Sequence, residues 1–187
     1  MKIWVYILLL VGYLFFVQAA KAEDIHFNND IYKLQFSQLS SETGRYVNEY
    51  YLNGENKSNW SKMIGIYYYP QISTPRKFAD KTEKEVEQKE NVAILKFIEN
   101  KKQDKALFSF LENGETNGNK YFEYNIYKYE DHPHKGMMVL RYAKRYFFKT
   151  NDEITNIGHD VKKINDDLLE QLIITPIPPI VEKDIDG

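Results

Sequence analysis

Residues 137–172, MMVLRYAKRYFFKTNDEITNIGHDVKKINDDLLEQL, join an alternating strand directly to a long amphipathic helix. In the first part, apolar side chains alternate with Arg141 and Arg145, which is the two-residue period of a strand that buries one face. The apolar positions are Met138, Leu140, Tyr142, Tyr146 and Phe148. The pattern predicts a sheet with one buried face and one partly solvated face.

The helix that follows begins at a capping box. Thr150 and Glu153 have the T-x-x-E spacing in which two side chains satisfy backbone N–H groups at a helix start. Apolar residues then recur at helical spacing, at Ile154, Ile157, Val161, Ile164, Leu168 and Leu172. Prolines from Pro176 onward prevent the helix from continuing. We therefore predict a long C-terminal helix followed by an extended, Pro-rich acidic tail over residues 176–187.

Six more segments upstream have strand-like composition and alternation. They are residues 31–39, 45–52, 63–69, 92–98, 106–111 and 121–129. Turn and loop sequences separate them, such as Asn53-Gly54 and residues 113–118, so neighbouring strands should pair antiparallel. A second helix is predicted over residues 75–90, with Thr74 as its cap, Pro75 at its first position and a narrow apolar stripe.

These elements predict a single α+β domain over residues 23–175. Its antiparallel sheet has about six to seven strands and two flanking helices. The longer, C-terminal helix packs across one face of the sheet. No internal repeat and no second domain boundary are evident.

Residues 1–22 have the pattern of a secretory signal peptide. Lys2 precedes an apolar run over residues 3–17, and Ala20 and Ala22 occupy the −3 and −1 positions of a cleavage site. The run is too short for a comfortable membrane span of about 20 residues. We expect export to the periplasm or beyond the cell, with cleavage near Ala22 and no stable membrane anchor afterwards. An uncleaved N-terminal anchor is the alternative.

The composition excludes several classes of chemistry. The chain has no cysteine, so it has no lipidation site, cysteine nucleophile or disulfide, and its stability must come from packed apolar area. Cleavage would leave 23 basic and 27 acidic residues, a balance that gives no reason to expect nucleic acid. Neither a G-x-S-x-G elbow nor a Gly-rich phosphate loop is present, and no cofactor is expected.

Residues 54–60, GENKSNW, are the first candidate binding region. Trp60, with Glu55 and Asn59, forms the rim of a ligand site in one interpretation. In the other, Trp60 anchors the loop by burying its large ring.

The run Tyr67-Tyr68-Tyr69 is the second candidate region, because neighbouring residues of a strand face opposite sides of the sheet. Tyr67 and Tyr69 belong either to a second layer covered by the helix over residues 75–90 or to an exposed aromatic patch that binds a partner. The basic residues Arg141, Lys144, Arg145 and Lys149 are expected to form a solvated face.

The segment Asp131-His132-Pro133-His134 has the only cluster of ligand-like side chains. His132 and His134 could hold zinc, copper or nickel if a third ligand came from elsewhere in the fold. The alternative is a polar loop between two strands in which Pro133 fixes the turn and both rings are solvated.

Residues 48–64, NEYYLNGENKSNWSKMI, resemble small uncharacterised exported bacterial proteins with a Gly-Glu-x3-Asn-Trp motif. The order of strands and helices is similar to the sandwich of PsbP-like proteins, which implies a sheet flanked by helices. Some relatives are lipoproteins, and the missing cysteine departs from them. The resemblance supplies no catalytic residues, and topology does not transmit function.

We therefore predict an exported, soluble binding module that is not an enzyme and engages a protein or cell-envelope partner. The alternative function is a metal-handling protein or an enzyme that uses the loop with His132 and His134. The sequence does not indicate the oligomeric state.

Overall fold

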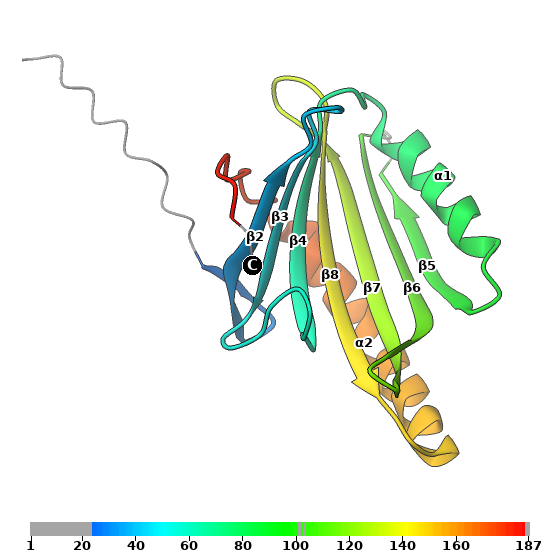
Figure 1. Ribbon diagram of the computed structural model, residues 1–187. Helices are drawn as coiled ribbons and strands as arrows, with labels where there is room; N and C mark the ends of the chain where they lie inside the picture. The colour runs from blue at the N-terminus through cyan, green and yellow to red at the C-terminus, as the bar shows by residue number, and fades with distance from the viewer. Residues whose placement is uncertain (1–23, 101, 103, 186–187) are drawn as a thin grey trace, which may run out of the picture.

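The computed structural model describes residues 24–100, 102 and 104–185. The signal peptide predicted over residues 1–22 lies outside them. The described residues form four strands, a helix, four more strands and a second, longer helix (Figure 1). The elements are β1 (Ile25–Phe27), β2 (Asp30–Leu39), β3 (Tyr46–Leu52), β4 (Lys62–Tyr69), α1 (Pro75–Glu87), β5 (Val92–Glu99), β6 (Lys105–Thr116), β7 (Asn119–Asp131), β8 (Met137–Phe147) and α2 (Asn151–Ile174).

All eight strands belong to one antiparallel sheet, in the order β1-β2-β3-β4-β8-β7-β6-β5. Two meanders of four strands therefore meet at the centre, where β4 pairs with β8. The predicted α+β domain with an antiparallel sheet and a longer C-terminal helix is confirmed. The predicted strand number of about six to seven is too low.

The missing strand is β1, which has only three residues and is too short to show alternation. It joins β2 through Asn28 and Asn29, both with positive φ, so a two-residue turn of the tight hairpin type connects the strands. β6 and β7 are also longer than predicted, because the turn lies at Asn117-Gly118. Gly114 stays within β6, where the Tyr121 ring lies against it.

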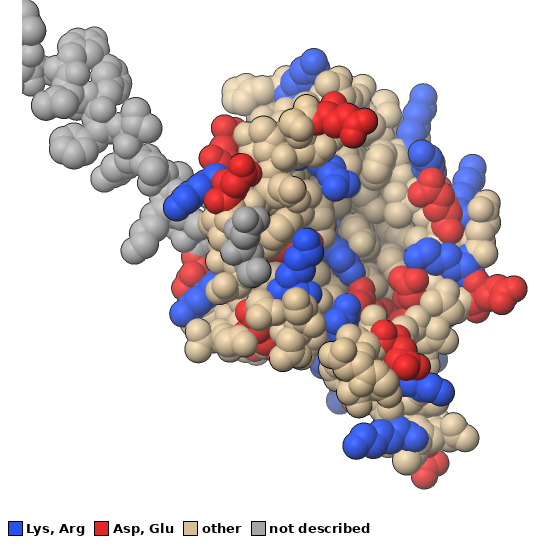
Figure 2. All heavy atoms as spheres, in the orientation of Figure 1, with Lys and Arg blue, Asp and Glu red and all other residues tan. Residues whose placement is uncertain are grey.

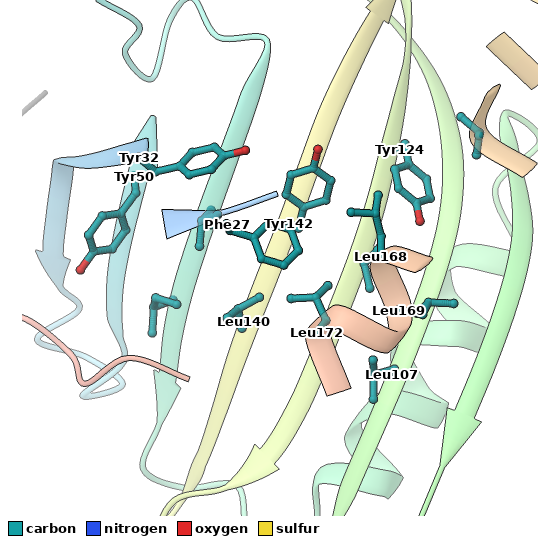
Figure 3. Packing of buried hydrophobic residues seen from close by; sticks show 14 of the residues in the cluster. Phe27, Tyr32, Tyr50, Leu107, Tyr124, Leu140, Tyr142, Leu168, Leu169 and Leu172 are labelled. Atoms are coloured by element: carbon teal, nitrogen blue, oxygen red, sulfur yellow. The ribbon is translucent and has the colours of Figure 1, made fainter. Parts of the chain in front are cut away.

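The main core lies between the sheet and α2. The predicted capping box is present: the Thr150 hydroxyl accepts a hydrogen bond from the Glu153 N–H, and the Glu153 carboxylate accepts one from the Thr150 N–H. Leucines of α2 pack against aromatic side chains of the sheet, as Figure 3 shows for Leu168, Leu169, Leu172, Tyr124 and Tyr142. Within this core, the Tyr124 hydroxyl donates to the buried Asn165 side chain at 2.9 Å.

The opposite face of the sheet is partly covered by α1, which contacts β5, β6 and β7 (Figure 1). The helix begins at Pro75 as predicted but ends at Glu87, and the Thr74 side chain makes no capping hydrogen bond. A second cluster is buried here: Ala79, Val86, Ala106, Phe108, Phe110, Tyr129, Met137 and Val139. The predicted partly solvated face thus carries a core of its own under one helix.

The chain after α2 returns to the other half of the sheet. Ile177 and Ile180 pack against the main core, and Ile185 forms a β-bridge with Ser37 on β2. The buried side chain of Asn48 accepts a hydrogen bond from the Val181 N–H at 2.7 Å and donates to the Val181 carbonyl at 3.1 Å. The extended tail is therefore fastened to β2 and β3 by a side-chain clamp.

Replacing Asn48 by alanine should release this tail. The change leaves the Val181 N–H without its acceptor, although the Ser37 hydroxyl still donates to the Val181 carbonyl, and an unmade buried hydrogen bond costs about 1–3 kcal/mol. Amide hydrogen exchange should speed up over residues 177–185, whereas the amides of α2 serve as the internal control and should keep their protection. Unchanged exchange at Val181 and Ile185 would contradict the clamp.

Candidate functional site

A pocket of about 380 Å³ lies between α1 and the face of the sheet that this helix partly covers. Figure 2 shows that face, with a hollow beside α1 in which basic and acidic side chains are visible. The volume falls within the range of about 300–1,000 Å³ typical of small-molecule sites. Aromatic side chains line much of the pocket: Tyr67, Tyr69, Phe78, Phe110, Tyr127 and Tyr129.

The charged centre of the pocket is Arg141 on β8. Its Nε donates to Asn125 Oδ1 at 2.9 Å, and its Nη2 donates to the Glu123 carboxylate. Both partners come from β7, which pairs with β8. Only 18 % of the Arg141 side chain and 11 % of the Glu123 side chain are exposed, so this ion pair is largely withdrawn from water.

The Glu123 carboxylate forms ion pairs with two arginines. Its other carboxylate oxygen accepts a hydrogen bond from Arg145 Nε at 3.1 Å. The Arg145 guanidinium carbon lies 3.7 Å from the centre of the Trp60 ring, and the same group stacks on Tyr121. A continuous series of contacts therefore runs from Trp60 through Arg145 and Glu123 to Arg141 in the pocket.

The protonation states of this site are fixed near neutral pH. Burial raises the pKa of Tyr67 and of Tyr127, although the nearby Arg141 charge acts in the opposite direction. Burial alone would lower the pKa of Arg141, but the surrounding Tyr127, Tyr67 and Glu123 raise it above its usual range. The site therefore presents neutral hydroxyl groups around a permanent cation.

The rim of the pocket carries paired charges. Lys89 lies 2.8 Å from the Glu112 carboxylate, and Lys81 lies 3.6 Å from that of Glu85. Tyr69 separates the pocket from a second one of about 410 Å³, where the Arg45 guanidinium lies 5.8 Å from the centre of the Tyr69 ring.

The predicted binding residues separate into two groups. Tyr67 and Tyr69 lie in the pocket under α1, as the second-layer interpretation requires. Trp60 lies at the opposite end of β4, where it is buried against Tyr51, Met63 and Ala143. Its position is the one described by the loop-anchor interpretation.

The loop around Trp60 satisfies its own polar groups. The Glu55 carboxylate accepts hydrogen bonds from the N–H and the hydroxyl of Ser61. Asn59 is exposed and its backbone pairs with that of Asn56. Glu55 and Asn59 therefore do not contribute to the pocket.

The histidine loop connects β7 and β8. His134 is exposed, and His132 Nδ1 faces the backbone N–H groups of His134 and Lys135 at 3.4 and 3.5 Å. The His132 ring also packs 4.9 Å from that of Tyr68. Among residues 24–100, 102 and 104–185, no group of three or more histidine, aspartate or glutamate side chains is arranged to hold a metal ion.

Arg141 and Glu123 are the site residues that the sequence interpretation missed. Arg141 was expected on a solvated face, whereas it is largely withdrawn from water and paired with Glu123. A signal was available, because the hairpin joining β7 to β8 places Glu123 opposite Arg145 and Tyr127 opposite Arg141. Opposite charges on one face of a hairpin at this register indicate an ion pair.

Alkaline titration should show that the folded protein keeps the phenolic protons of its buried tyrosines to high pH. Burial raises the pKa of Tyr142 to about 12 and that of further tyrosines above their usual value, namely Tyr32, Tyr50, Tyr51, Tyr67, Tyr124, Tyr127, Tyr129 and Tyr146. Above pH of about 10 the unfolded chain loses tyrosine protons that the folded protein keeps, so the free energy of unfolding falls as pH rises.

The tyrosinate absorbance of these nine tyrosines should therefore appear together with the loss of circular dichroism in one alkaline unfolding transition. Full tyrosinate absorbance near pH of about 10 in a protein that is still folded would contradict this expectation.

A family model matches residues 19–177, so the chain belongs to that family, whose function is uncharacterised. No curated protein matches the chain, and no solved structure matches it. In the part of the chain that the structure describes, no helix is both long and apolar enough to cross a membrane.

Proposed function

We propose that this protein is an exported binding module whose ligand site is the pocket between α1 and the sheet. One observation carries the proposal: a largely buried arginine, Arg141, faces an open pocket with aromatic walls. Ligand pockets typically combine apolar walls with a few well-placed polar groups. Tyr67 and Tyr69, which were candidate binding residues from the sequence, are part of these walls.

The protonation states favour binding over catalysis. Proton transfer works best with a group whose pKa lies near the working pH. The raised pKa values of Tyr67, Tyr127 and Arg141 instead keep the protons on these three side chains. Fixed donors and a fixed charge are suited to holding a ligand without transforming it.

Methyl NMR tests the pocket directly. Val86 and Val139 line it, whereas Val161 belongs to α2 and is buried on the opposite side of the sheet. A library of small neutral, anionic and cationic fragments should contain members that shift the methyl signals of Val86 and Val139 in a saturable way. The Val161 signals are the control and should stay in place. A library that shifts neither pocket valine would overturn the proposed site.

Export is the second part of the proposal. It is supported by the basic, apolar and small-residue pattern of residues 1–22, and it implies a protein or cell-envelope component as the natural partner. A PsbP-like sandwich is the fold relationship we propose for this class. Cell fractionation with N-terminal sequencing should find a mature chain that begins at Glu23. A cytosolic chain that retains residues 1–22 would overturn this part.

A further inference from the structure

We infer that the pocket under α1 binds a monocarboxylate that carries an apolar or aromatic group, with the carboxylate on Arg141. This inference rests on the proposed function and names the ligand chemistry of the same site. It depends on three observations: the net charge at the base of the pocket, the N–H donors there and the apolar surface of the walls.

At the base of the pocket, Arg141, Arg145 and Glu123 carry one excess positive charge, while the nearby Glu49 carboxylate accepts a hydrogen bond from the Tyr51 hydroxyl. Arg141 and Arg145 share a single carboxylate, that of Glu123, so the group of three has a net charge of +1. At the rim, Lys89 with Glu112 and Lys81 with Glu85 form pairs that cancel. A ligand with one negative charge neutralises this site, whereas a dianion would leave excess negative charge in a place partly withdrawn from water.

The Arg141 guanidinium has N–H groups with which it can bind a ligand. Nε and Nη2 of Arg141 donate to Asn125 and Glu123, and the Tyr67 hydroxyl is a further hydrogen-bond partner of this guanidinium. A ligand carboxylate would be a stronger acceptor than this neutral hydroxyl for the remaining N–H groups. The Arg141 guanidinium also lies over the Tyr127 ring, 5.5 Å from its centre. The planar guanidinium matches the two oxygens of a carboxylate better than a lysine would.

The walls of the pocket are suited to the apolar part of a ligand. Phe78 and Val86 of α1 form one side of the pocket, and Phe110, Tyr127 and Tyr129 of the sheet form the other. The Phe110 and Tyr127 rings are nearly parallel, with an interplanar angle of 6° and their centres 5.9 Å apart. An aromatic or branched aliphatic group of a ligand, placed between the side chains of α1 and those of the sheet, would bury apolar surface on both of its sides.

The decisive comparison uses the unmodified mature protein and two probes that differ only in charge, 3-phenylpropionate and 3-phenylpropanamide. Isothermal titration should give saturable binding of the acid, with an affinity at least tenfold higher than that of the amide. Val86 and Val139 methyl signals should shift with the acid, which places it in the pocket.

A variant of Arg141 then tests whether this residue supplies the positive charge that binds the carboxylate. Arg141→Met should weaken binding of 3-phenylpropionate at least tenfold and remove its advantage over 3-phenylpropanamide, because the charge is lost while Glu123 still pairs with Arg145 and the walls remain. Lys144→Met is the matched control: it removes a cation from the same strand outside the residues that line the pocket, and it should change neither affinity.

The outcomes separate the two proposals. Equal affinities for acid and amide, with both shifting Val139, would overturn the carboxylate inference and keep the pocket as a ligand site. Preferential binding of a cationic fragment there would do the same. If Arg141→Met failed to fold, the comparison of acid and amide on the unmodified protein would still decide the inference. If no fragment of any charge shifted Val86 or Val139, the proposed site itself would be wrong.

Discussion

Replacing Glu123 by leucine should lower the free energy of unfolding by about 3–5 kcal/mol, the range found when one partner of a buried ion pair is removed. Glu123 is the shared carboxylate of Arg141 and Arg145, whose side chains are 18 % and 15 % exposed. Without it, two guanidinium groups in partial burial would face each other with no counter-charge. Leucine fills a similar volume, so the loss would come from the unpaired charges and not from a cavity.

Chemical denaturation followed by circular dichroism measures this effect. Glu115→Leu is the matched control, because Glu115 is exposed on the neighbouring strand β6 and a surface change of this kind stays within about 0.5 kcal/mol. Glu123→Gln should fall between the two, since the amide keeps an acceptor but loses the charge. A loss below about 1 kcal/mol for Glu123→Leu would show that the ion pair is not buried in solution.

Replacing Lys128 by methionine should destabilise the protein by about 2–4 kcal/mol. Only 3 % of the Lys128 side chain is exposed, and its ammonium group lies 2.8 Å from the Glu130 carboxylate. It also donates to the carbonyls of Ile173 and Thr175, at 3.2 and 2.7 Å. These carbonyls lie at the C-terminal end of α2, whose last turn has no basic residue of its own. Lys128 therefore supplies from β7 the cation that a helix C-terminus favours.

Lys105 offers a close control for this variant. It also pairs with Glu130, at 3.1 Å, but 52 % of its side chain is exposed. Lys105→Met should therefore change the free energy of unfolding by less than about 1 kcal/mol. In Lys128→Met, amide exchange should accelerate first over the last turn of α2 and the residues after it. Similar losses for the two lysine variants would contradict a capping role for Lys128.

The elements that could be predicted are those with strong local signals. The capping box at Thr150 and Glu153 and the apolar stripe after it placed α2 correctly, because capping and helical periodicity act within a few residues. The alternation in residues 137–148 likewise located β8. By contrast, β1 depends on pairing with β2 through a turn at Asn28 and Asn29, and three residues carry too little pattern to be recognised alone.

For the candidate site too, some features could be predicted from the sequence and others could not. Alternation correctly placed Arg141 on the face away from α2, and the tyrosine run correctly suggested a layer under the helix that follows β4. The burial of Arg141 was not predictable in this way. It requires β7 to bring Glu123 and Asn125 to the same face, and α1 to close one side of the pocket.

The physical reason lies in the range of the interactions involved. Turn residues, caps and side-chain periodicity act between near neighbours, so the amino-acid order alone indicates seven of the eight strands and both helices. Whether a charged side chain on a given face is solvated depends on what covers that face. For Arg141 the surrounding side chains are Tyr67 of β4 and Glu123, Asn125 and Tyr127 of β7. Its burial and its pairing therefore exist only once these strands are assembled around β8.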